Sequence, residues 1–453
     1  MFKIKLFYLK NLTVKYLVFN FLVLTGILPA QIPDSISVSE LYPFRVDSIS
    51  IKGNVQTEEF IITRELTFNV GDTLSAEVVQ FNRERIYSLG LFAHVYVYPV
   101  VRNSVNILEI VVEEGWYIYP VPFVTVKEKD FKKLSFGIYL KINNFRGRNE
   151  EINAVTAFGY DPAYSLNYYN PNLIGKEDFF LRTGFIYSDV NNKSPSAEIL
   201  YGEKFSQKFF RTHFLIGKRL SLFHKIYISA AYNYYETPKY FSGINVSGER
   251  IDRFPDLQLG YEFDSRDLIQ FPRNGIFASA TYAFKGLGLN SINFKVARID
   301  FREYRKIIGN LFSKWRFAAR FTQGNEIPFY DYSILGIDEK VRGYFTRKTE
   351  GNHFYFTSVE FFYPIVEELN LNFDFIPIIP EQLLKFRIAL YSQLFGDAGT
   401  TQYKHQPLSI NRFISGYGAG ITLLVLPYNI LRIEYALDNF GNPEWIFDLG
   451  VSF

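Results

Sequence analysis

The chain has 453 residues, of which 18% are aromatic, including 33 Tyr and 47 Phe. This length allows more than one domain, and the aromatic content is typical of a membrane β-barrel with aromatic girdles, although a large soluble β-protein is also compatible with it. The absence of Cys excludes disulfides, thiolate metal sites and a lipoprotein anchor. Without the four Lys of residues 1–30, the chain has 45 basic and 46 acidic residues. It therefore has no excess of positive charge that would indicate nucleic-acid binding.

Residues 1–30 have the layout of a secretory signal peptide. Four lysines form a basic region, and the following run from Tyr16 to Leu28 is mostly apolar. This run is short for a transmembrane helix, and Pro29-Ala30 precedes a plausible cleavage point before Gln31. We therefore predict a signal peptide at 1–30 and a linker at 31–43.

Residues 44–115 predict a small α/β module. A strand leads into the turn at Gly53, and Thr57 opens a helix with acidic residues in its first turn. Ser75 is a candidate N-cap for a second helix that Gly90 ends. Two strands follow, at 92–101 and 105–113. Because this module has apolar faces of its own, we expect it to fold as a separate soluble fragment.

From Trp116 onward, helical spacing gives way to alternation. In the segment 257–264, for example, every odd position is apolar and every even one is polar or Gly, which fits a lipid-facing exterior and a wet lumen. A soluble sandwich also alternates, but the signal peptide and the recurrence of such strands favour a barrel over residues 116–453. Sixteen or seventeen strands can be counted, with Ser196–Lys204 the doubtful one.

The last strand places four apolar residues on one face. It ends the chain with an aromatic residue, as the closing strand of bacterial outer-membrane barrels usually does. We predict a C-terminal assembly signal at Phe447, Leu449, Val451 and Phe453.

Two connections between strands carry unusual residues. The first is a turn motif made of Asp264, Arg266, Asp267, Pro272 and Gly275. Taken alone, these residue types indicate a charged hairpin turn. The second is a loop with Val341, Arg342, Gly343 and Tyr344.

The loop arginine needs a carboxylate partner if it enters the lumen, because an unpaired buried charge is costly. Strand parity places Glu360 opposite Val359 and Phe361, and Asp397 opposite Leu394. Both carboxylates should therefore face the lumen. The sequence predicts a buried ion-pair cluster of Arg342 with Glu360 and Asp397.

The order and spacing of these motifs resemble the BamA/TamA family of outer-membrane assembly factors, also called bacterial surface antigens, over residues 44–453. The module resembles a POTRA domain, above all at the junction 85–92, and 144–147 and 170–173 look like parts of that family's early barrel strands. The resemblance implies that the Arg-Gly-aromatic loop folds into the lumen and pairs with Glu360 and Asp397. It also implies a weak seam between the first strand, Tyr117–Val126, and the last.

The same resemblance implies a function at the bacterial outer membrane with the POTRA domain in the periplasm. There the POTRA would receive unfolded outer-membrane or secreted polypeptides, and the seam would template their strands. Outer-membrane lipids, accessory lipoproteins and periplasmic chaperones are further partners in this reading. Since only one POTRA is found, a two-partner-type secretion pore is the alternative, and a passive channel a third.

Nothing in the sequence points to an enzyme or a cofactor. The five His are scattered without metal-ligand spacing. Gly416, Gly418 and Gly420 superficially resemble a nucleotide-binding loop, but they alternate within a strand, which favours close packing or a plugged lumen. We expect no catalytic residues, no metal and no nucleic acid.

Overall fold

The structure is a computed structural model that describes residues 42–449 apart from 127–130, 176, 193, 203–204, 337–338, 345–347, 374–375, 377–378 and 428. The predicted signal peptide at 1–30 and nearly all of the predicted linker lie outside the described residues. Val451 and Phe453 of the predicted assembly signal also lie outside them.

The N-terminal module is a three-stranded sheet with two helices. The sheet order is β2-β5-β4, with β2 parallel to β5 and β4 antiparallel to it, and a short β1–β3 pair lies beside the sheet. The Ser75 hydroxyl accepts from the Val78 amide at 3.4 Å and so caps α3, as predicted. The elements are β1 (Phe44–Arg45), β2 (Ser48–Lys52), α2 (Glu59–Thr63), β3 (Thr73–Leu74), α3 (Ala76–Tyr87), β4 (Phe92–Arg102) and β5 (Val105–Glu114).

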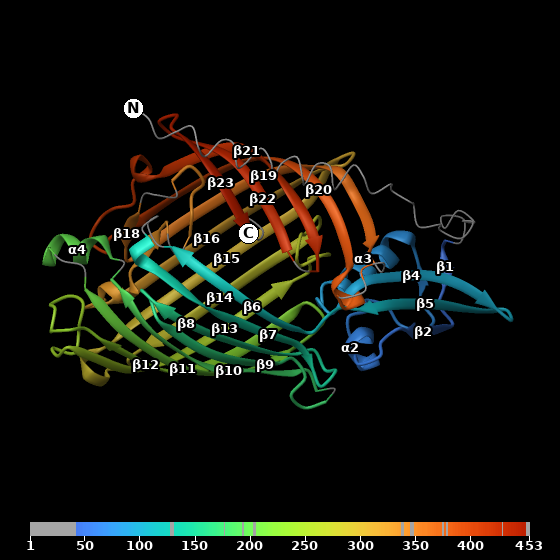
Figure 1. The fold of residues 1–453 in the computed structure, drawn as a ribbon, viewed down its shortest axis with the longest axis horizontal. Helices are drawn as coiled ribbons and strands as arrows, with labels where there is room; N and C mark the ends of the chain where they lie inside the picture. Colours follow the sequence, from blue (N-terminus) through green and yellow to red (C-terminus); the bar gives the residue numbers. More distant parts are fainter. Residues whose placement is uncertain are drawn as a thin grey trace. The chain divides into compact units, whose positions relative to one another are not determined.

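The rest of the described chain is dominated by one antiparallel sheet of 16 strands, which run side by side in chain order (Figure 1). This confirms the predicted barrel fold. Only the short hairpin of β17 and β18 interrupts the sequence of neighbours. The strands are β6 (Ile118–Val126), β7 (Leu134–Phe145), β8 (Glu150–Gly159), β9 (Ala163–Asn170), β10 (Phe179–Asn191), β11 (Ser206–Arg219), β12 (His224–Glu236), β13 (Ile251–Asp264), β14 (Gly275–Lys285), β15 (Phe294–Ile308), β16 (Leu311–Gly324), β17 (Ser333–Leu335), β18 (Thr349–Gly351), β19 (His353–Asn372), β20 (Lys385–Gln402), β21 (Ile414–Leu426), β22 (Asn429–Asp438) and β23 (Pro443–Leu449).

The prediction of a possible seventeenth strand at Ser196–Lys204 is wrong. Helix α4 (Pro195–Tyr201) occupies most of Ser196–Lys204. The Ser194 hydroxyl accepts from the Ala197 amide at 3.1 Å, and Pro195 stands in the first turn, where its missing N–H costs nothing. These local helix signals outweigh the alternation that suggested a strand.

The barrel strands alternate as the sequence predicts. In β22, Leu431, Ile433 and Tyr435 are exposed, whereas Arg432 and Glu434 are buried. This is the arrangement of an apolar outer face and a charged lumen. Among the described residues, no helix has both the length and the apolar character needed to cross a membrane.

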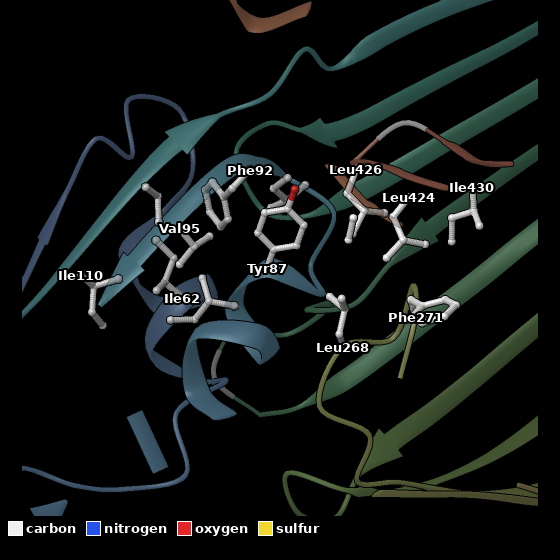
Figure 2. Close-up of a cluster of buried hydrophobic side chains, with 14 of the residues drawn as sticks. Ile62, Tyr87, Phe92, Val95, Ile110, Leu268, Phe271, Leu424, Leu426 and Ile430 are labelled. Atoms are coloured by element: carbon white, nitrogen blue, oxygen red, sulfur yellow. The ribbon is translucent and has the colours of Figure 1, made fainter. Parts of the chain in front are cut away.

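One buried apolar cluster runs through the N-terminal module and into the barrel (Figure 2). From the module come side chains such as Tyr87 and Phe92, and from the barrel Leu426 and Ile430. The predicted turn motif contributes Leu268 and Phe271, from the connection between β13 and β14. The two parts therefore share a core, and the separate folding of the soluble module stays a prediction.

Charged contacts reinforce this junction. Glu84 of α3 receives two bonds from Arg387 of β20, at 2.7 and 3.0 Å, and both side chains are buried. Glu113 of β5 lies 3.1 Å from His94 and 3.2 Å from Lys385. The hydrogen bond to His94, followed by the lysine, lowers the pKa of Glu113 to about 2, against a penalty from partial burial.

The turn motif is held against α3. The Ile269 amide donates to the hydroxyl of Ser88, the C-cap of α3, at 2.9 Å, and that hydroxyl donates to the Asp267 carbonyl at 3.2 Å. Within the turn, the Asp267 carboxylate accepts from the Leu268 and Arg273 amides at 2.8 and 3.0 Å. The turn is thus braced internally and fixed to the module.

The two ends of the 16-stranded sheet are β6 and β23. In the part of the chain that the structure describes, no backbone pairing joins them. These two strands are the ones between which the sequence predicts a weak seam.

Candidate functional site

The loop between β16 and β19 carries the predicted motif. Val341 and Tyr344 are buried together with Ala318, Phe354 and Phe356 of the barrel wall. Between them Gly343 has a φ of +93°, and a Cβ there would lie 3.0 Å from the Leu437 carbonyl oxygen. A side chain at this position would be strained and crowded, which explains why the turn needs glycine.

Arg342 reaches a carboxylate on each of three strands. Its Nε and Nη2 donate to the two oxygens of Asp397 on β20, at 2.7 and 2.8 Å. Its Nη1 donates to Glu434 of β22 at 2.7 Å and to Glu360 of β19 at 3.2 Å. The Arg342 backbone amide also donates to Asp397, at 3.1 Å. The guanidinium therefore ties the loop to three strands at once.

Neutral groups complete the arginine site. Ser358 accepts from Nη2 of Arg342 at 3.2 Å and donates to Asp397 at 2.6 Å. The guanidinium carbon lies 3.6 Å from the centre of the Phe395 ring, a close cation–π contact. Every side of the charged group is in contact with protein, as a buried ion needs.

Two further cations, Lys314 and Arg432, border the arginine site. Lys314 of β16 is 1% exposed and lies 3.1 Å from the second oxygen of Glu360. Its ammonium also lies over the rings of Phe271 and Phe362, at 3.8 and 4.6 Å. Arg432 lies 3.7 Å from Glu434. Arg432 also lies 2.6 Å from Asp448, its nearer carboxylate, so the three cations Arg342, Lys314 and Arg432 lie among four carboxylates.

The glycines of β21 make room for the loop. A Cβ at Gly416 would lie 1.9 Å from the Arg342 carbonyl oxygen, and one at Gly420 2.7 Å from Cγ of Glu434. These glycines do not form a nucleotide loop. They line the wall against which the loop and its partners pack, in agreement with the plugged-lumen interpretation.

A side chain at Gly416 should therefore displace the loop. We expect Gly416→Val to separate Arg342 from its carboxylates, and trypsin to cleave the loop after Lys340 and Lys348 at least about tenfold faster, since breaking a buried ion pair costs about 3–5 kcal/mol. Gly396→Val on β20 is the matched control, because a Cβ there meets nothing within 4 Å. Equal cleavage of both variants would show that the wall does not hold the loop.

Sequence reasoning placed both Glu360 and Asp397 in the lumen, and the structure brings Arg342 into contact with each. It missed Glu434, although that residue alternates with apolar positions in the segment 431–437. Parity alone could have placed Glu434 in the lumen. No signal in the sequence says that β22 lies beside the loop.

The other predicted residues lie apart from this cluster. Arg266 pairs with Asp264 through two bonds of 2.8 and 2.7 Å. At Gly275, φ is +110° and a Cβ would lie 2.4 Å from the Ser265 carbonyl oxygen, so the turn requires glycine. Phe447 is exposed on the outer face of β23, and Leu449 ends that strand. No group of three His, Cys, Asp or Glu side chains suited to a metal occurs among the described residues.

Two family models match the chain. The POTRA model, described as a surface antigen variable number repeat, matches residues 44–115, and the Omp85 superfamily domain matches residues 144–453. None of the curated proteins matches the sequence.

Solved structures share the fold at low sequence identity. BamA from Haemophilus ducreyi lacking POTRA domains 1–3 is 17% identical, with a TM-score of 0.51 over 90% of this chain and 84% of that one. CdiB from Escherichia coli is 11% identical, with a TM-score of 0.55 over 90% of this chain and 75% of that one.

The second family model covers more than half of the chain and includes the arginine site, and the first covers the N-terminal module. At the level of the family, the function is insertion or secretion of polypeptides at the outer membrane. The barrel end that contacts the module is accordingly the periplasmic end. The chain therefore belongs to the Omp85 superfamily, as an outer-membrane β-barrel protein with one POTRA domain in the periplasm.

Proposed function

We propose that this protein inserts β-strands of other outer-membrane proteins through the seam between β6 and β23. The observation that carries the proposal is that these strands end the sheet without pairing to each other in the described part of the chain. An unpaired strand edge is a template for another strand. In lipid such an edge must find a partner, because its backbone groups have no water to bond.

The contents of the barrel also favour a lateral route. From the extracellular side, the loop carrying Arg342 enters the lumen and is fixed to three strands. At the periplasmic end, the module and the turn around Phe271 pack into one apolar core with the barrel wall (Figure 2). A passive channel would need an open lumen instead. A client that enters at the seam leaves the contacts of the Arg342 loop and those of the module in place.

The proposed partners follow from this route. The POTRA domain would hold unfolded outer-membrane polypeptides, and lipids would meet the apolar outer face near the seam. Accessory lipoproteins and periplasmic chaperones would deliver clients to the module. In this proposal the last strand, with Phe447, Leu449, Val451 and Phe453, also carries the signal for assembly of the protein itself.

Site-specific photo-crosslinking during client assembly tests the route. A crosslinker at Val124, on the edge strand β6, should capture an incoming barrel polypeptide. The matched control is Ile138, which is also exposed on the outer face but lies on the paired strand β7. A third position, Tyr139 of β7, lies on the lumenal face, opposite in parity to Ile138. Capture of secreted polypeptides at Tyr139 and none at Val124 would overturn strand insertion in favour of the secretion pore.

A further inference from the structure

The free edge of β6 carries two prolines. The strand reads Ile-Tyr-Pro-Val-Pro-Phe-Val-Thr-Val, with Pro120 and Pro122 at alternate positions. Proline has no backbone N–H, so neither residue can donate to a neighbouring strand. Proline in a sheet is therefore confined to strand edges, strand starts and bulges.

The hydrogen bonds of β6 show which way the prolines face. The Asn143 amide of β7 donates to the Tyr117 carbonyl at 2.8 Å. In an antiparallel ladder, the N–H and C=O of one residue point to the same side, and the side alternates along the strand. The register of β6 with β7 is continuous from Ile118 to Val126. Even-numbered residues, including Pro120 and Pro122, therefore point their backbone groups away from β7, toward the seam.

The seam edge is consequently poor in donors. Five residues of β6 face it, and only Ile118, Val124 and Val126 retain an N–H. The stretch next to the periplasmic end offers the carbonyls of Pro120 and Pro122 without matching donors. A strand that pairs there can donate its own N–H groups, but its carbonyls remain unpaired.

In a closed barrel, the last strand would face this donor-poor stretch. The Asp438 amide donates to the Asn442 carbonyl at 3.1 Å, so even-numbered residues of β23 face β22 and odd-numbered ones face the seam. Because β6 leaves the module and β23 runs back toward it, an antiparallel closure would bring the end of β23 opposite the start of β6. The prolines thus stand in the part of β6 that such a closure would bring toward the end of β23.

We propose that Pro120 and Pro122 keep the periplasmic half of the seam unzipped, as a strip of acceptors for the N–H groups of a client's transmembrane β-strand. This inference rests on the proposed function. Since β23 and a client strand can each gain only bonds to the acceptors along the strip, replacing one with the other costs little. The outer face of β6 suits such a strand: Ile118 and Val124 share that face with Ile142 and Phe136 of β7, and all four are apolar. Nine residues of β6 are long enough to cross the membrane when tilted.

The number of donors on the edge can be changed in both directions. Pro120→Val with Pro122→Val adds two donors and keeps the apolar outer face, whereas Val124→Pro removes one. Ile118→Val is the matched control, because it changes a side chain on the same face and leaves the donors unchanged. The readout is hydrogen–deuterium exchange of the β23 amides in the full-length protein in lipid nanodiscs, without client.

The double proline variant should slow that exchange on the order of tenfold, as two added hydrogen bonds imply, and Val124→Pro should speed it. If the double variant does not fold, Pro122→Val alone and Val124→Pro should still change the exchange rate of the β23 amides in opposite directions. Unchanged exchange in the proline variants would overturn the proposal.

Insertion of a barrel client into liposomes separates this inference from the proposed function. Slower exchange at the seam together with several-fold slower insertion supports both. Slower exchange with insertion at the wild-type rate would show that the prolines keep the seam unpaired. It would refute insertion of clients through the seam.

Discussion

Arg342→Ala should release the loop and sharply reduce client insertion. The substitution leaves Asp397, Glu360 and Glu434 buried, with Lys314 beside Glu360 and with Arg432 3.7 Å from Glu434 but paired more closely with Asp448. Loss of one member of a buried ion pair costs about 3–5 kcal/mol, a large share of the stability of a typical domain. We expect the compact form of the barrel to be lost at a lower temperature, as measured by its heat-modifiable gel shift.

The geometry of the guanidinium should matter as well as its charge. Arg342→Lys keeps the charge, but it cannot reproduce the two parallel bonds to Asp397 and a third to Glu434. It should therefore fall between wild type and Arg342→Ala. Pairing Arg342→Ala with Asp397→Asn removes one uncompensated carboxylate and should recover part of the lost stability.

Arg412→Ala is the control for these variants, because that arginine is exposed on a neighbouring loop. The hypothesis of a loop held by ion pairs is wrong if Arg342→Ala inserts clients at the wild-type rate and keeps its gel shift. It is also wrong if Arg412→Ala does equal damage, since that would point to a general effect of lost surface charge.

The arginine site could be predicted in part because two kinds of information in the sequence coincide. Strand parity fixes which side of the wall a carboxylate faces, and an arginine beside glycine in a loop needs such a partner. This was enough for Glu360 and Asp397. It was not enough for Glu434 or Lys314, because parity gives a residue's face and not its height in the barrel or its neighbours across the lumen.

The shared core at the junction shows the other limit. Tyr87 and Phe92 could be assigned to the interior of the module, and Leu426 to the wall of the barrel, from local pattern alone. That they belong to one cluster depends on how the two parts dock, which local periodicity does not encode. The same holds for Phe271, whose place in the turn between β13 and β14 does not indicate that it joins this cluster. By contrast, α4 was missed despite a local signal, the Ser-Pro start of a helix.

Removal of the N-terminal module should destabilise the barrel as well as stop client handling. Truncation removes Tyr87, Phe92 and the other apolar side chains that the module contributes to the cluster it shares with Leu268 and Leu426 of the barrel (Figure 2). Each such side chain contributes about 1.5–3 kcal/mol when fully buried. Arg387 would also lose both bonds to Glu84. We expect the truncated barrel to lose its compact form at a temperature at least about 10 °C lower, since several kcal/mol are removed.

A point variant tests the same junction without removing the module. Glu84→Ala leaves Arg387 buried with Glu368 as its remaining carboxylate, at 3.2 Å, and should lower the transition temperature by a smaller amount. Glu77→Ala, on the exposed first turn of the same helix, is the matched control. If the truncated barrel and Glu84→Ala both keep the wild-type transition, the contacts at the junction contribute nothing to barrel stability. The module would then be a separable domain whose only role is to receive clients.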